Sequence, residues 1–184
     1  THYIVSGGTG SQSGADWSNA LTAIPTTPAR GDTFFVASGN SGYSLITTPA
    51  SGTSAITFKK ATSADHGTYT GWLSAYGTGQ AVWSYPGICW QFQCPYLVFD
   101  GNSWIGPTAN TNAAQYGFKL HTTYVGSAPY GALSVFYGYT ANNITLSGVE
   151  IQGNGQDSDC NHHNLGIYIS SGGTANNWIL NHCF

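Results

Sequence analysis

The segment 150–164 carries the densest group of side chains that could do chemistry. It holds three acids and two imidazoles, at Glu150, Asp157, Asp159, His162 and His163. A pair of carboxylates can act as acid and as base or nucleophile in glycoside hydrolysis. The Asp157-x-Asp159 pair beside Glu150 could instead give oxygen ligands to Ca²⁺. A third interpretation, which we favour, is a polar loop whose Asp and Asn residues cap turns. A metal shared by His162 and His163 is not expected, because neighbouring residues of a strand point to opposite faces.

Tryptophans offer a second kind of chemistry, the stacking of rings on sugars. Four of the six tryptophans of the chain are the candidates, namely Trp72, Trp83, Trp90 and Trp104. Exposed rings of this kind bind glycans or fill protein interfaces, where Trp and Tyr are enriched. Packing in the core or against a loop is the commoner fate of such rings and remains an open alternative.

The four cysteines suggest a disulfide framework. Cys89 and Cys94 could close a local disulfide across a bend, and Cys160 and Cys183 form the natural second pair, although four cysteines allow three connectivities. Zinc is disfavoured because no CxxC occurs. Cys183 could alternatively be a small apolar residue of the core. Asn143, in Asn-Ile-Thr, is a weak candidate for N-glycosylation.

Charge is scarce in this chain of 184 residues. Four basic and seven acidic residues make up 6 % of it, against roughly 25 % in an average domain. Four basic residues cannot build the positive face that binds nucleic acid. No apolar run approaches the ~18 residues of a membrane span. The even number of cysteines, the absence of Met and the start at Thr1 predict an extracellular, mature chain from which a signal peptide has been removed.

A repeated pattern indicates how these residues are positioned. Residues 97–104, 142–149 and 176–183 each alternate apolar and polar side chains, bend at a small or polar residue and resume. Such alternation is typical of strands, and repetition at this spacing is typical of a solenoid. Stacking would place Ile144, Leu146 and Val149 under Trp178, Leu180 and Cys183. It would also stack Asn142 and Asn143 on Asn176 and Asn177 as turn residues that tolerate left-handed backbone.

The whole chain reads as one all-β domain. We expect strands over residues 1–6, 33–37, 45–48, 55–59, 81–83, 96–99, 117–121, 133–137, 144–151, 166–169 and 178–184. A short helix over 16–24 is predicted, with Asp16 as its N-cap and Pro25 and Pro28 ending it. Residues 61–80 form a long loop in this prediction.

Two stretches give the chain its resemblance to a known family. The first is Tyr3-Ile4-Val5-Ser6, a Gly/Ser loop, Ala15-Asp16-Trp17-Ser18-Asn19-Ala20 and the run 30–37. The second is the set of repeated strands, with Gly166-Ile167-Tyr168-Ile169 followed by Asn176-Asn177-Trp178. In these stretches the chain resembles the N-terminal part of secreted right-handed parallel β-helix proteins, the pectin-lyase-like group. The resemblance implies a β-solenoid in which residues 1–32 form a capping strand and helix and residues 33–184 form coils, either truncated or completed by a neighbouring subunit.

The resemblance also implies an activity that the residues support only in part. A lyase of this group uses an Arg or Lys base near Ca²⁺ and an acidic sugar. Lys119 is the central basic residue here, since Arg30, Lys59 and Lys60 lie early in the chain. An outward structural role on strand 117–121 is the preferred interpretation of Lys119. The paired Asp-Asp of the group's hydrolases does not occur.

Two functions from different classes are therefore expected. The first, which we favour, is an extracellular structural or adhesive protein that could assemble end to end with itself into a filament; its support is the scarcity of charge, the many aromatic residues and a last expected strand that no turn or polar cap follows. The second is a carbohydrate-active enzyme, a polysaccharide lyase or glycoside hydrolase, or a glycan-binding module. Neither function requires a cofactor, apart from the Ca²⁺ considered for Asp157 and Asp159.

Overall fold

The structure is a computed structural model that describes residues 1–49, 51–101, 116–123, 131–135, 139–153, 165–169 and 172–183, with backbone only at 131–135 and 165. Its strands are β1 (His2–Ile4), β2 (Thr33–Val36), β3 (Gly39–Ser41), β4 (Ser44–Ile46), β5 (Ile56–Lys60), β6 (Ala81–Tyr85), β7 (Trp90–Phe92), β8 (Leu97–Asp100), β9 (Phe118–Thr122), β10 (Gly131–Val135), β11 (Ile144–Ser147), β12 (Val149–Gln152), β13 (Leu165–Ile169) and β14 (Ile179–Asn181). Two short 3₁₀ helices, η1 (Trp17–Asn19) and η2 (Ser74–Gly77), are the helical segments of these residues. None of the described helices is long and apolar enough to cross a membrane.

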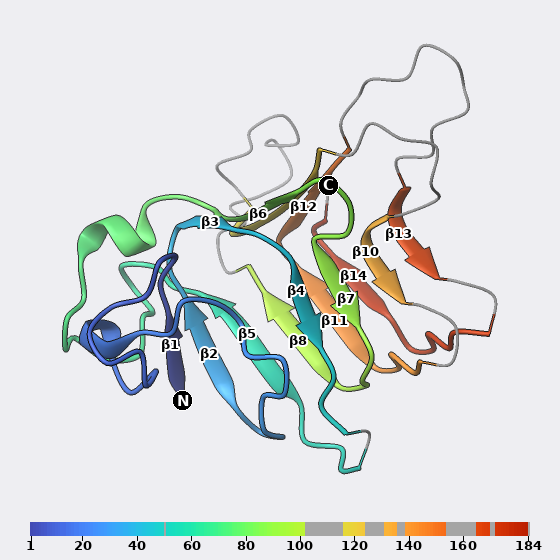
Figure 1. The fold of residues 1–184 in the computed structure, drawn as a ribbon, viewed down its shortest axis with the longest axis horizontal. Coiled ribbons are helices and arrows are strands. Elements are labelled where there is room, and N and C mark those ends of the chain that lie inside the picture. The colour runs from blue at the N-terminus through green and yellow to red at the C-terminus, as the bar shows by residue number, and fades with distance from the viewer. Residues whose placement is uncertain are drawn as a thin grey trace.

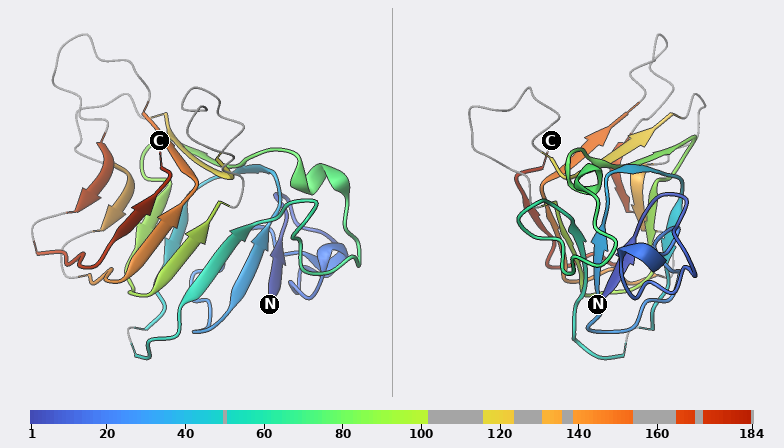
Figure 2. Two further views of the ribbon diagram at one scale, coloured as in Figure 1. Left: turned by 180° about the vertical axis from the view of Figure 1, so that it is seen from behind. Right: turned by 90° about the vertical axis from the view of Figure 1, so that its left-hand side faces the viewer.

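The strands form three parallel sheets that the chain visits in turn (Figure 1). Sheet 1 has the order β1-β2-β5-β8-β11-β14, sheet 2 the order β12-β9-β6-β3 and sheet 3 the order β13-β10-β7-β4. From β2 onward each sheet takes every third strand, so a set of three strands forms one layer (Figure 2). We call such a set a coil, for example β5, β6 and β7. The predicted all-β class is confirmed, and these sheets are compatible with a β-solenoid.

Register follows from the alternation of side chains. In β5, Ile56, Phe58 and Lys60 are buried and the two residues between them are half-buried. Phe34, Phe58 and Phe99 are register partners in β2, β5 and β8, and their rings stack at 5.2 and 4.8 Å. Because a slip of one residue would turn these rings to the opposite face, the apolar ladder sets the pairing.

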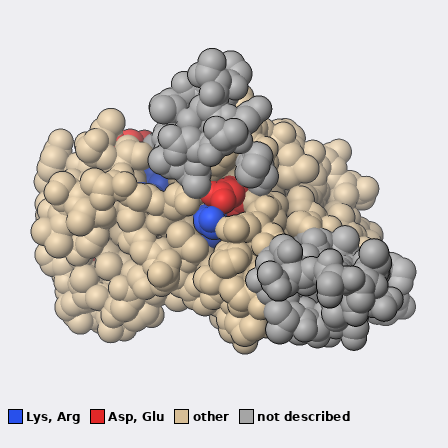
Figure 3. All heavy atoms as spheres, turned by 90° about the horizontal axis from the view of Figure 1, so that it is seen from above, with Lys and Arg blue, Asp and Glu red and all other residues tan. Residues whose placement is uncertain are grey.

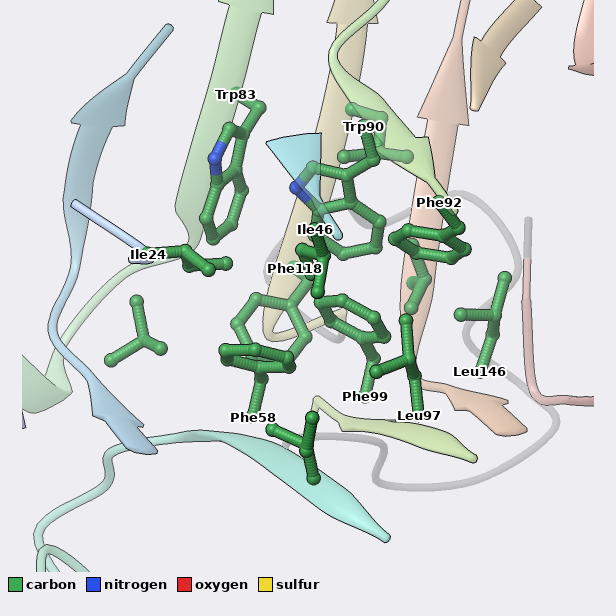
Figure 4. Close-up of a cluster of buried hydrophobic side chains, with 14 of the residues drawn as sticks. Ile24, Ile46, Phe58, Trp83, Trp90, Phe92, Leu97, Phe99, Phe118 and Leu146 are labelled. Carbon is green, nitrogen blue, oxygen red and sulfur yellow. The ribbon is translucent and has the colours of Figure 1, made fainter. Parts of the chain in front are cut away.

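The interior between the sheets is filled with rings. Figure 4 shows Trp83, Trp90, Phe92, Phe99 and Phe118 pointing toward one another from strands of all three sheets. The indole rings of Trp83 and Trp90 meet edge to face at 5.0 Å, and Trp90 stacks on Phe99 at 4.1 Å. Rings at these separations add attraction beyond the burial of their area. Trp83 and Trp90, whose exposure could not be decided from the sequence, are therefore core residues.

An asparagine ladder forms one corner of the coils, as the sequence predicts. Asn143 and Asn177 both have φ of 57°, and Asn177 Nδ2 donates to Asn143 Oδ1 at 3.1 Å. The backbone N–H of Asn176 donates to Asn142 Oδ1 at 2.7 Å, and Leu146 pairs with Leu180 in the adjoining strands. Asn tolerates the left-handed region because its short side chain bonds locally.

Replacing Asn143 tests this corner. We expect Asn143→Ala to lower the free energy of unfolding by about 2 kcal/mol, from left-handed strain of about 1 kcal/mol and a lost hydrogen bond of about 1 kcal/mol. Asn143→Gly keeps the backbone freedom and should lose about half as much. Urea unfolding of both variants measures the difference. Equal losses for Ala and Gly would contradict the conformational part of the argument.

The N-terminal segment covers the free edge of β1, although not with the predicted helix. Only Trp17–Asn19 are helical, and the Asp16 side chain makes no capping hydrogen bond, accepting one from Asn19 Nδ2 instead. The reason is that the backbone of this segment is used by β1: Tyr3 N–H donates to Gly14 O at 3.1 Å, and Leu21 N–H donates to Tyr3 O at 2.8 Å. An α-helix over 16–24 would have used the Leu21 N–H, which instead donates to β1.

Two strands were not expected from the sequence. β3 consists of Gly39, Asn40 and Ser41, residues of low strand propensity. β7 (Trp90–Phe92) lies inside the stretch that we had expected to bend around a disulfide. β3 pairs in parallel with β6, and β7 pairs in parallel with β4. Pairing within the sheet therefore imposes the extended conformation on both strands.

Candidate functional site

Two of the sequence-predicted candidates, Lys119 and Glu150, are brought together on the outside of sheet 2. They are register partners in β9 and β12, and Lys119 Nζ lies 2.9 Å from Glu150 Oε1. Gln80, which immediately precedes β6, donates from Nε2 to Glu150 Oε2 at 2.8 Å. Glu150 is 7 % exposed. The cluster Gln80–Lys119–Glu150 therefore joins three successive coils of the molecule.

The chemistry of this cluster is limited by how completely it is satisfied. Both oxygens of the Glu150 carboxylate have partners, and the ammonium of Lys119 faces an opposite charge at contact distance. Such a pair has little remaining field with which to attract an acidic sugar. Figure 3 shows how few charged side chains interrupt the uncharged surface on the face seen from above. We conclude that the contacts fit a structural clamp between coils, and that catalysis would require the pair to separate.

The row of sheet 2 beside the cluster adds further polar groups. Ser84, His121 and Gln152 occupy register positions next to Lys119 and Glu150, one step along the strands and on the same face. Sequence reasoning missed Gln80 and His121 as neighbours of the pair. The signal for His121 was present, since residues two apart in strand 117–121 share a face, whereas nothing local pointed to Gln80.

The remaining acids and histidines of segment 150–164 cannot be placed. Asp157, Asp159, His162 and His163 lie outside the described residues, and so do Cys160 and Trp104. The Ca²⁺ site at Asp157 and Asp159 stays a prediction. Within the part of the chain that the structure describes, no group of three or more His, Cys, Asp or Glu side chains could hold a metal ion. Glu150 itself belongs to β12 and not to a loop.

Two of the four tryptophans proposed to stack on glycans are core residues. Trp83 is 1 % exposed and Trp90 fully buried, so neither can meet a sugar from solvent. Both rings point inward because the strand alternation places them opposite Phe118 and Phe99. Trp72 is half-buried, with its ring stacked on His66 at 4.1 Å and edge-on to Trp17 at 5.1 Å. It holds the 61–80 loop against the N-terminal segment.

The predicted Cys89–Cys94 disulfide is not formed. Cys89, Cys94 and Cys183 are free thiols. Cys89 and Cys94 are fully buried among the apolar side chains of the core, and burial raises the pKa of each thiol to about 11. Desolvation of the thiolate is the leading cause in both. Both cysteines belong to the hydrophobic core cluster and behave as small apolar residues.

Lys60 is a buried cation that sequence reasoning did not single out as special. It ends β5 with 1 % exposure, and its Nζ donates to the carbonyl oxygens of Ala61 at 2.5 Å and Tyr76 at 3.0 Å. Burial lowers its pKa to about 8 from the ordinary 10.5. Lys60 thus fastens the 61–80 loop to sheet 1, while Lys59 points outward and pairs with Asp65.

The pKa of Lys60 predicts a change of stability with pH. Between about pH 8 and pH 10.5 the unfolded chain holds the Lys60 proton more tightly than the folded chain, so this residue's contribution to stability rises with pH in that window. Lys60→Met removes the effect. Wild type should therefore gain stability relative to Lys60→Met as the pH is raised from 8 to 10.5 in urea unfolding. A difference between the two proteins that does not change with pH would contradict this.

The chain matches no protein-family model, no curated protein and no solved structure. The resemblance to pectin-lyase-like proteins therefore stays a hypothesis, and the functional argument depends on the geometry of the described residues alone.

Proposed function

We propose that this chain is a right-handed parallel β-helix with an extracellular structural or adhesive role, and that copies of it associate through the layer that ends in β14. The three sheets visited in turn, with every strand pair parallel, support the solenoid. Parallel strands of one sheet are joined by right-handed crossovers in nearly all known cases. The scarcity of charge supports an extracellular role, whereas the free thiols remove the disulfide argument for it.

The exposure of β14 carries the proposal for association. Ile179 is 59 % exposed and Leu180 is 53 % exposed, while Leu146, the register partner of Leu180 one coil earlier, is fully buried. A strand edge with unpaired backbone groups and exposed apolar side chains is a template for another strand. Burying Leu180 at a contact as completely as Leu146 is buried would contribute roughly 1 to 2 kcal/mol per copy to the free energy of association.

The two ends of the molecule differ, and this decides which surfaces meet. The outer edge of β1 is already bonded to its own chain, through Gly14 and Leu21. Among the described strands, β14 pairs with β11 alone, so its other edge has no such cover in the described residues. We therefore expect β14 of one copy to meet β14 of a second copy about a twofold axis. Growth into a filament would require the N-terminal cover to open.

Sedimentation velocity of the untagged chain tests the association. We expect a concentration-dependent dimer in wild type and a monomer for Leu180→Asp, because a carboxylate cannot be buried unpaired at the contact. Tyr69→Ser is the matched control, since Tyr69 has the highest exposure, 82 %, among the large hydrophobic side chains of the described residues and lies far from β14 in the sequence. A wild-type protein that stays monomeric at millimolar concentration, or a Leu180→Asp variant that still dimerises, would refute the proposal.

The cluster Gln80–Lys119–Glu150 favours carbohydrate cleavage as a second candidate function. A carboxylate and an amine lie in contact on an outward sheet face, with His121 in the adjoining row. Proton transfer to or from a sugar could use these groups if substrate separated the pair. Polygalacturonate and neutral polysaccharides should then be cut by wild type and spared by Glu150→Gln. Absence of cleavage by wild type in both classes would remove this candidate.

A further inference from the structure

Three tyrosines with half-exposed side chains come from three separate parts of the chain. Tyr43 connects β3 to β4, Tyr85 ends β6, and Tyr139 precedes β11; their exposures are 40, 41 and 39 %. The rings of Tyr43 and Tyr85 lie 5.9 Å apart at 38°. Burial raises the pKa of Tyr43, and the charges of Tyr85 and Tyr139 raise it further. We call these residues the tyrosine patch.

Hydrogen bonds and close contacts position Tyr85 and Tyr43. Gly42 and Gly87 both approach the Tyr85 ring. A Cβ at Gly42 would lie 3.9 Å from a Tyr85 ring carbon, and a Cβ at Gly87 would lie 3.8 Å from another, which are ordinary contact distances. The carbonyl of Tyr85 accepts hydrogen bonds from the N–H groups of Gly87 at 2.8 Å and Thr123 at 3.0 Å. Tyr43 Oη donates to Gln91 Oε1 at 2.5 Å, which fixes the second ring. Rings fixed before binding lose little entropy when a ligand stacks on them.

No cation is free to bring an anionic ligand to the patch. All four basic side chains of the chain are engaged elsewhere: Arg30 donates to the carbonyls of Pro49 and Pro95, Lys59 pairs with Asp65, Lys60 donates to Ala61 and Tyr76, and Lys119 pairs with Glu150. The patch therefore offers ring faces, phenol hydroxyls and the amide of Gln91. This combination suits a ligand with flat apolar faces and many hydroxyls and without charge.

We propose that the tyrosine patch binds a neutral glycan, whose sugar rings stack on Tyr85 and Tyr43. This inference rests on the adhesive part of the proposed function and gives its ligand class. It differs from the sequence-based expectation, which assigned stacking to tryptophans. The tilt of 38° between the Tyr43 and Tyr85 rings suits a glycan chain that bends from one sugar to the next.

Isothermal titration of the full chain with neutral hexasaccharides (cellohexaose, xylohexaose and mannohexaose) tests the patch. At least one should bind, and Tyr85→Ala should weaken that binding about tenfold or more, which corresponds to about 1.4 kcal/mol for a lost stacking residue. Tyr85→Phe keeps the ring and should stay within about threefold of wild type, which separates stacking from loss of folding. Tyr69→Ala, at an exposed tyrosine outside the patch, should bind as wild type does.

The same titrations on the Leu180→Asp background separate this proposal from the association proposal. Binding there should match wild type, because β14 takes no part in the patch. Three results would overturn the inference: no binding of any neutral hexasaccharide at millimolar concentration, equal binding by Tyr85→Ala and wild type, or tighter binding of hexagalacturonate than of every neutral hexasaccharide.

Discussion

Gly117→Ala is expected to destabilise the chain by at least about 3 kcal/mol, a large part of the roughly 5 to 15 kcal/mol by which native proteins are stable. A Cβ at residue 117 would stand 1.8 Å from the carbonyl oxygen of Gly101 and 2.6 Å from its carbon. Atoms of the backbone cannot rotate away as a side-chain end does. The Lys60 side chain, 2.8 Å from the same Cβ, closes the other direction.

The strain would spread from Gly117 to Gly101 and Gly148, whose backbones approach one another closely. A Cβ on Gly101 would in turn meet the carbonyl oxygen of Gly148 at 2.1 Å, so Gly101 cannot move toward Gly148 to make room. Gly117 O also accepts the hydrogen bond of Ala81 N–H at 2.8 Å, which starts β6. Relief by movement of residue 117 therefore costs the pairing of β6 with β9. Either route breaks contacts between successive coils.

Gly166→Ala is the matched control for this prediction. Its Cβ would lie 3.5 Å from Ile151 Cγ2, an ordinary contact, and its backbone does not require glycine. Urea unfolding should find Gly166→Ala within about 0.5 kcal/mol of wild type. If Gly117→Ala unfolds at the same urea concentration as Gly166→Ala, the close approach of the corner backbones is not what holds the coils together.

The strands of sheet 1 could be predicted because their signals are local. Thr33–Val36 is a strongly apolar run, Leu97–Asp100 and Ile144–Ser147 alternate, and Asn142-Asn143 marks a corner by its own tolerance of left-handed backbone. β3 could not be predicted, since Gly39, Asn40 and Ser41 become extended only through pairing with β6. The helix over 16–24 failed for a related reason, because β1 uses the backbone of that segment.

The candidate site depends on register, which sequence alone does not give. Lys119 and Glu150 were separate candidates, and their contact exists because Phe118 aligns with Val149 and Leu120 with Ile151. The buried tryptophans show the same limit. An aromatic in a three-residue strand such as Trp90–Phe92 gives no sign of which face is inward until neighbouring coils are stacked on it.

The second large effect is expected at the Lys119–Glu150 pair, where one substitution should cost more than two. Lys119→Met leaves the buried Glu150 carboxylate with Gln80 alone, and we expect a loss of about 3 kcal/mol in the free energy of unfolding. Adding Glu150→Gln removes the uncompensated charge while keeping an oxygen for the amide of Gln80. The double variant should recover more than half of that loss, because the cost lies in burying an unpaired charge and not in losing attraction.

A double-mutant cycle in urea distinguishes this clamp from an ordinary surface ion pair. The cycle compares wild type, Lys119→Met, Glu150→Gln and the double variant, and should give a coupling energy of about 1 to 3 kcal/mol. An exposed pair would couple by only about 0.2 to 1 kcal/mol and would weaken in 1 M salt. Because the side chains of Lys119 and Glu150 are only 20 % and 9 % exposed, the coupling should persist in salt. A small, salt-sensitive coupling would mean that the pair does not hold the coils together, and would return Lys119 and Glu150 to the list of groups free to meet a substrate.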